Sequence, residues 1–281
     1  MKKNMQNEST AQSSPKASPR QSESVRKRFI LLDELRGLTL ISMILYHFMW
    51  DLAYIVGLSM PWYRSVGAHI WQQSICWTFI LLSGFCWSLG HHPFRRGMIV
   101  FFCGMTVTAV TLVLGEAYTI LFGVLTLIGS SMLLMIPLDF VLNRLLCKLS
   151  SISLKKVLLS LLTAICFVLF WQSKHHGDIL PADFPRNLFT AYLGFPFGGF
   201  YSTDYFPIVP WFFLYITGYL LHKLWQAFDT PGSVCAHIDD FACASHIPLL
   251  SFLGRHCLLL YMLHQPVLYV ISMIISMFLT Q

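Results

Sequence analysis

The chain has 281 residues, of which 56% are hydrophobic and only 11% are charged, and its mean hydropathy is +0.62. A soluble globular domain carries about 25% charged residues, so this composition excludes a soluble protein and indicates a polytopic membrane protein. The net charge of +6 comes from basic residues scattered over short loops and the N-terminal tail. Because no basic patch is interleaved with aromatic residues, no nucleic acid partner is expected.

The N-terminal segment 1–27 is polar, rich in Ser, Gln and Lys, and nearly free of large apolar residues. Such a segment cannot bury a core. We therefore predict a disordered cytoplasmic tail, followed by one transmembrane domain over residues 28–281. The eight cysteines include no C-x-x-C pair and no metal-ligand spacing, so neither a disulfide framework nor a metal site is expected.

Seven apolar runs are long enough to cross the hydrocarbon core as helices, which takes about 20 residues. A shorter run, 187–201, contains Gly194, Pro196, Gly198 and Gly199, and we interpret it as a broken or re-entrant segment. The predicted fold is an all-α transmembrane helical bundle of about seven spans, with eight possible. The predicted spans are 35–57, 66–89, 97–114, 118–138, 154–171, 208–226 and 256–279.

Lysine and arginine are concentrated in alternate loops, which predicts the orientation of the bundle. A cytoplasmic N-terminus leaves only Arg64, Lys174 and Arg186 in the outside loops. An odd number of spans then places the C-terminus outside, together with the long loop 172–207. The predicted location is a multi-pass position in the plasma (cytoplasmic) membrane.

The first predicted span carries charge at both ends, in the stretch RFILLDELRGLTLISMILYHFMWDL (28–52). Asp33 and Arg36 are three residues apart and share a helical face. They form either an ion pair that fixes the helix end, or a site in which Arg36, with Arg28 and Gly37, faces an anionic ligand from the cytoplasm. The second interpretation rests on the guanidinium fork, whose geometry matches phosphate.

Near the far end of this span, His47 lies about 21 Å along the helix axis from Asp33, and Asp51 follows on the same face. A carboxylate beside an imidazole raises its basicity and fixes its tautomer, as a general base requires. The alternative is a pair of interfacial polar residues, although intramembrane ionisable residues are usually functional. The hairpin 35–89 brings His69 near the same level, where it is either structural or part of this site.

Other polar residues lie in or beside later spans. His264 either caps a carbonyl that Pro266 frees in the last span, or contributes to a site. Ser202, Asp204 and Tyr205 directly precede the sixth span. They either cap that helix or hold a hydroxylated substrate over the outer end of the bundle.

Four stretches resemble, in order, the blocks of one family of membrane enzymes: LRGLTLISMILYHFMWDL, FGVLTLIGSSMLL, YSTDYFPIVPWFFLYITGYLL and LGRHCLLLYMLHQPVL. The resemblance covers residues 28 to 270, nearly everything beyond the N-terminal tail. The first is similar to the first-helix signature of membrane acyltransferases, an Asp-x-x-Arg pair preceding a histidine, which the acyltransferase-3 group shares. The set resembles bacterial members of the heparan-alpha-glucosaminide N-acetyltransferase catalytic-domain family.

Two positions depart from that family's pattern. The block around Thr126 often carries His or Gln at this position. Eukaryotic relatives place Asn near the position of His47 and are thought to use a histidine just before the second span, which best matches His69 here. The resemblance therefore leaves His47 and His69 as alternative catalytic bases.

The resemblance implies transfer of an acetyl or other acyl group from cytoplasmic acyl-CoA to an amine or hydroxyl of a sugar or glycan on the outer face. Acetyl-CoA is the expected co-substrate, without a metal. Either histidine would act as a general base or as an acyl carrier, by direct or ping-pong transfer. The donor would pass through a basic mouth formed by Arg28, Arg36, Arg95 and Arg96.

A proton-coupled membrane transporter is the alternative function, because charged residues inside a bundle also mark proton pathways. Such a transporter would carry paired broken helices in two matching halves. Only the segment 187–201 is broken, which favours the acyltransferase.

Overall fold

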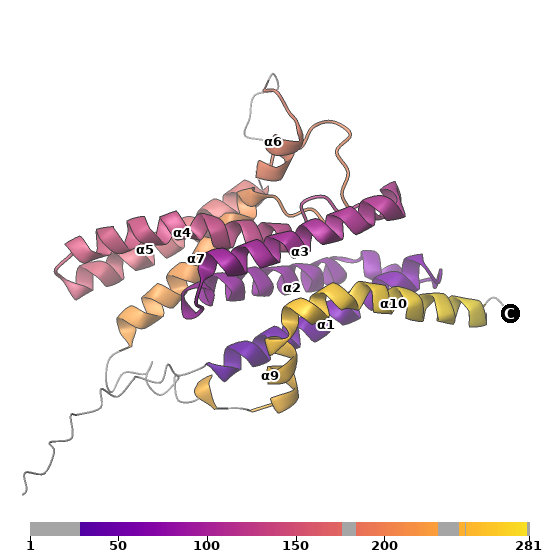
Figure 1. Ribbon diagram of the computed structural model, residues 1–281, viewed down its shortest axis with the longest axis horizontal. Helices are drawn as coiled ribbons and strands as arrows, with labels where there is room; N and C mark the ends of the chain where they lie inside the picture. The colour runs from indigo at the N-terminus through magenta and orange to yellow at the C-terminus, as the bar shows by residue number, and fades with distance from the viewer. Residues whose placement is uncertain (1–28, 176–183, 230–241, 245, 280–281) are drawn as a thin grey trace, which may run out of the picture.

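The computed structural model describes residues 29–175, 184–229, 242–244 and 246–279, and these ranges are helical without a strand (Figure 1). The predicted tail and Arg28 lie outside the described residues. The described ranges contain nine α-helices: α1 (Ile30–Tyr54), α2 (Val66–Phe85), α3 (Pro93–Leu114), α4 (Val124–Lys148), α5 (Ile152–His175), α6 (Leu188–Leu193), α7 (Ile208–Phe228), α9 (Pro248–Arg255) and α10 (Cys257–Leu279).

The predicted all-α fold is confirmed, and each of the seven predicted spans falls on one long helix. Four helices are long and apolar enough to cross a membrane, namely α3, α4, α5 as far as Lys174, and α10. The protein is therefore a multi-pass membrane protein. The other three long helices, α1, α2 and α7, carry polar residues within their length, and their crossings remain a prediction.

Two predicted segments differ from the observed helices. The span 118–138 begins late, because a 3-10 turn (Glu116–Tyr118) and the positive φ of Phe122, 58°, keep the chain irregular until Val124. The broken segment 187–201 contains only α6, a helix of six residues that ends at Gly194 with φ 128°. Six residues rise about 9 Å, so α6 cannot cross the hydrocarbon core as an eighth span.

The centre of the bundle is the crossing of α2 and α7. An added Cβ at Gly84 would collide with the carbonyl oxygen of Tyr215, and one at Gly218 with that of Leu81. Glycine at both positions therefore lets the two backbones touch, as small residues do between membrane helices. Around this crossing, α2, α4, α5 and α7 form the larger apolar core, with Tyr215, Leu214 and Phe170 fully buried.

A smaller core joins α1 to α10 and to the outer part of α2. Leu40 and Met43 of α1 pack with Ile75 of α2 and with Leu260 and Tyr261 of α10. Figure 1 shows α1, α9 and α10 together on one side of α2, with α3 and α4 on the other. The face of α1 that carries Leu40 and Met43 is therefore packed against α10 as well as α2.

Candidate active site

The N-terminal end of α1 holds an ion pair between a buried carboxylate and a partly exposed arginine. Nη1 of Arg36 donates to Oδ1 of Asp33 at 3.2 Å, and Asp33 is only 6% exposed. The predicted ion pair is thus present. Arg36 is also within electrostatic range of Arg96 of α3 and of Cys257 of α10.

Arg96 is held in place by the turn between α2 and α3. Its Nη1 donates to the carbonyl oxygen of Trp87 at 3.5 Å, and its guanidinium occupies the space where residue 90 would carry a Cβ if it were not Gly90. Arg36 and Arg96, here called the arginine pair, place two guanidinium groups at one end of the bundle. Two neighbouring positive charges of this kind are suited to an anion such as a phosphate.

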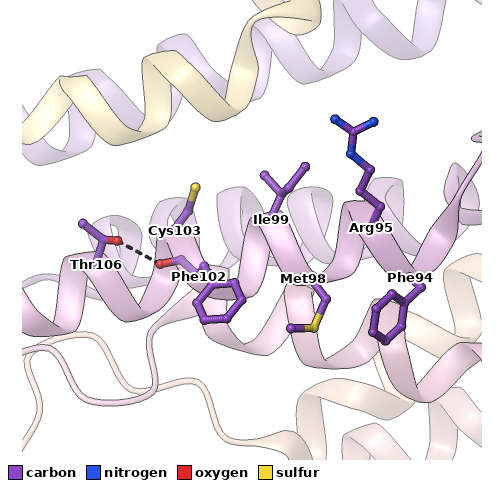
Figure 2. Close-up of a pocket in the computed structure, with 7 residues that line it drawn as sticks. All are labelled: Phe94, Arg95, Met98, Ile99, Phe102, Cys103 and Thr106. Atoms are coloured by element: carbon purple, nitrogen blue, oxygen red, sulfur yellow. Dashed lines mark hydrogen bonds between the residues drawn. The ribbon is translucent and has the colours of Figure 1, made fainter.

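The neighbouring Arg95 takes a different direction. It is exposed and lines a pocket of about 510 Å³ on the surface of α3, together with apolar residues such as Ile99 and Phe94. Figure 2 shows Arg95 and Ile99 on one side of the helix and Phe94 on the other. Arg96 is thus within electrostatic range of Arg36, whereas Arg95 lies on the surface of α3.

At the other end of α1, two histidines from different helices meet. The ring centroids of His47 and His264 of α10 are 5.0 Å apart. Nδ1 of His264 bonds the carbonyl oxygen of Tyr261, so this nitrogen carries the proton and Nε2 presents a lone pair when the ring is neutral. His264 thus bonds a carbonyl of its own helix and also lies against His47. This carbonyl is that of Tyr261, whereas Pro266 leaves the carbonyl of Met262 without its donor, so the predicted cap differs in its partner.

Asp51 is fully buried one helical turn beyond His47. Its Oδ1 accepts a hydrogen bond from Nε2 of Gln265 at 3.1 Å. No hydrogen bond joins Asp51 to His47 in the described part of the chain, so the carboxylate is held from α10 instead of by the imidazole. Sequence reasoning did not select Gln265 as a site residue. The one feature of the sequence that could have pointed to it is its polar amide next to His264 inside an apolar span.

Four buried polar atoms beside Asp51 have no hydrogen-bond partner of ordinary geometry among the described residues: Oδ2 of Asp51, Nε2 of His264, Oε1 of Gln265 and Oγ of Ser272, whose hydroxyl also interacts with Asp51. Buried polar groups are normally paired, and an unpaired one costs about 1–3 kcal/mol. We call the four residues that meet here the α1–α10 polar cluster: His47, Asp51, His264 and Gln265. Its unpaired atoms can all accept hydrogen bonds, which suits a ligand that carries N–H or O–H groups.

His69 lies outside this cluster. It is in the first turn of α2, and its side chain is exposed. Within the described ranges, no hydrogen bond or ring contact connects it with His47, His264 or Asp51. The hairpin of α1 and α2 forms as predicted, but the side chain of His69 does not join the other two histidines.

The three polar residues before α7 fasten loops together. Ser202 both donates to the carbonyl oxygen of Leu121 and accepts from its N–H, at 3.0 and 2.9 Å. The hydroxyl of Tyr205 donates to the carbonyl oxygen of Ala191. Asp204 accepts from the N–H of Val124 at the start of α4. The three residues therefore connect loops and the start of α4. They do not cap α7, whose N-cap is Pro207 without a side-chain cap, so the predicted cap of that helix is wrong, and their role in holding a substrate stays a prediction.

The fold and these two polar regions define a class, a helical multi-pass membrane protein with ionisable residues at both ends of its first long helix. The family model described as "Heparan-alpha-glucosaminide N-acetyltransferase, catalytic" matches residues 28–266, and the chain belongs to that family. Membership implies a membrane-bound acetyltransferase that uses acetyl-CoA as its donor. No curated protein and no solved structure matched the chain.

Proposed function

We propose that the protein transfers an acetyl group from acetyl-CoA on the cytoplasmic side to an amine or hydroxyl of a sugar on the outer side. The α1–α10 polar cluster carries this proposal, because its unpaired buried acceptor atoms adjoin two imidazoles. Intramembrane ionisable groups of this kind usually serve a site. With the N-terminus in the cytoplasm, as the distribution of basic residues over the loops predicts, this cluster lies near the outer side of the membrane.

The arginine pair is the proposed contact for the phosphates of the donor. Arg36 and His47 are eleven positions apart in α1, which corresponds to about 16 Å along the axis. A donor with a long arm between its phosphates and its thioester fits this separation, whereas a small substrate could not reach both ends. Arg28 and Arg95 remain predicted contributors to the same basic mouth, Arg28 outside the described residues and Arg95 on the surface of α3.

His47 is the proposed general base. Its imidazole would take the proton of the acceptor amine or hydroxyl while the acceptor atom attacks the carbonyl carbon of the thioester. The new C–N or C–O bond forms, the C–S bond breaks, and the thiolate of coenzyme A leaves and recovers a proton from the imidazolium. In the ping-pong alternative His47 itself accepts the acetyl group first.

His264, Asp51 and Gln265 would position the acceptor for this step. His264 offers a lone pair on Nε2, and Asp51 offers its second carboxylate oxygen, because the first is occupied by Gln265. These acceptors match the N–H and O–H groups of a sugar. Ser202, Asp204 and Tyr205 would support the substrate indirectly, by holding the loops over the outer ends of the helices.

The test is release of free coenzyme A by purified protein in detergent, given acetyl-CoA and a panel of sugar acceptors. Loss of a general base costs about 10²- to 10⁴-fold in rate, so we expect His47→Ala to lose at least the lower figure. We expect His69→Ala to retain most of the activity, since this side chain lies outside the cluster. His91→Ala, which changes an exposed histidine of the α2–α3 turn, is the matched control.

Full activity in both His47→Ala and His69→Ala, in protein with an unchanged melting temperature, would contradict the mechanism. Loss in His69→Ala alone would transfer the role of base to His69. Uptake of a solute driven by a proton gradient in liposomes, without coenzyme A chemistry, would support the transporter instead.

A further inference from the structure

The short helix α9 has two unlike faces. Ser251 and Gly254 are buried against α1, whereas Leu249 and Phe252 on the opposite face are 64% and 56% exposed. Ile247, at the N-cap, is also half exposed. Three large apolar side chains therefore lie together on the outside of a helix of only eight residues.

The contacts with α1 fix where this helix lies. Oε1 of Glu34, in the first turns of α1, accepts hydrogen bonds from the N–H groups of His246 and Ile247, both at 2.8 Å. An added Cβ at Gly37 would collide with the carbonyl oxygen of Leu250. Glu34 thus caps the start of α9, and a backbone contact holds α9 across the N-terminal end of α1.

The following helix places α9 at a membrane boundary. Only His256 separates α9 from α10, and α10 is one of the candidate membrane spans. A helix joined so closely to the start of a span lies at the level where the hydrocarbon core ends. With a cytoplasmic N-terminus this is the inner surface of the membrane.

The charge of α9 agrees with such a surface. Arg255 is exposed in the last turn and donates to Oγ of Ser251 at 3.1 Å, and His256, beside it, is exposed as well. No acidic residue occurs in α9 or at His256. An apolar face with a basic end is the pattern of helices that lie in the plane of a membrane and contact anionic headgroups.

We infer that α9 is an interfacial helix: Ile247, Leu249 and Phe252 insert at the boundary between headgroups and acyl chains of the inner leaflet, and Arg255 binds an anionic phospholipid headgroup. Burial in the membrane removes the three side chains from water, which explains why they are apolar. The inference is independent of the proposed catalysis. It gives the chain a lipid contact at the helix end that also carries Asp33 and Arg36.

A photo-crosslinking residue, benzoylphenylalanine, tests this when it replaces Phe252 in full-length protein reconstituted into vesicles. Phe278 of α10, which is 74% exposed, is the matched lipid-facing control. His91, exposed in the α2–α3 turn, is the control outside the helices. We expect mass spectrometry to find phospholipid adducts at positions 252 and 278 and few at 91.

The lipid composition tests the role of Arg255. Adducts at position 252 should favour phosphatidylglycerol over phosphatidylcholine in mixed vesicles, and Arg255→Gln should reduce that preference about five-fold, whereas Arg255→Lys should keep it. An adduct yield at 252 no higher than at 91, or adducts to protein in place of lipid, would overturn the inference. A preference that Arg255→Gln leaves unchanged would overturn the headgroup contact.

Discussion

At the scale of single residues, the α1–α10 polar cluster joins side chains of the first and the last long helix: His47 lies against His264, and Asp51 accepts a hydrogen bond from Gln265. Spacing along α1 identified His47 and Asp51 as residues of one helical face, and this is where unpaired polar atoms are buried. The spacing could not show that Asp51 would bond Gln265, which is 214 positions away in the sequence. A helical period predicts a face, whereas the helix that packs on that face is decided by the whole bundle.

Asp204 gives a prediction that does not depend on catalysis. Burial raises the pKa of its carboxyl group to about 6, although the N–H of Val124 opposes the shift. Since the folded protein then binds a proton that the unfolded chain releases, stability should fall as the pH rises from about 4 to about 6. Asp204→Asn should flatten this part of the profile of melting temperature against pH.

The control for this measurement is Asp229→Asn, which changes an exposed carboxylate at the end of α7. It should leave the pH profile of the melting temperature as it is in the unchanged protein. An Asp204→Asn variant whose melting temperature keeps the same slope between pH 4 and pH 6 would show that this carboxyl group does not titrate there.

At the scale of helices, glycine decides which elements approach most closely. Gly84 and Gly218 let α2 and α7 touch, while Gly37 and Gly254 do so for α1 and α9. Apolar length alone predicted the seven long helices, because each must cover a membrane thickness. The same criterion of apolar length missed α9, because a helix of eight residues is shorter than any span. Its position is defined only by packing against α1.

The contact at Gly254 can be tested by adding a side chain. A Cβ there would collide with the carbonyl oxygen of Asp33, so Gly254→Val must push α9 away from α1. Overpacking of this kind costs about 1–3 kcal/mol, and we expect a lower melting temperature together with faster proteolysis near residues 246–256.

Gly198→Ala is the matched control, because an added Cβ at this position meets nothing within 4 Å. It should change neither the melting temperature nor the rate of proteolysis. Equal stability of Gly254→Val and the unchanged protein would mean that α9 is not packed on α1 through this glycine.

At the scale of the whole molecule, the contacts between α1 and α10 determine whether the number of membrane crossings is odd or even. Gly254, just before α10, lies against Asp33 near the start of α1, and Gln265 further along α10 bonds Asp51 near the end of α1. The two helices therefore run parallel. If both cross the membrane, they cross it in the same direction, and the number of crossings from the start of α1 to the end of α10 is odd.

This parity agrees with seven spans and disagrees with eight, and it places the two ends of the helical domain on opposite sides. Fusions of alkaline phosphatase, which is active only outside, and of green fluorescent protein, which fluoresces only in the cytoplasm, report each side. We expect phosphatase activity after Glu116 and after Leu279, and fluorescence after Lys148. Fluorescence after Leu279 would require an even number of crossings, and the parallel pair of α1 and α10 would then be wrong.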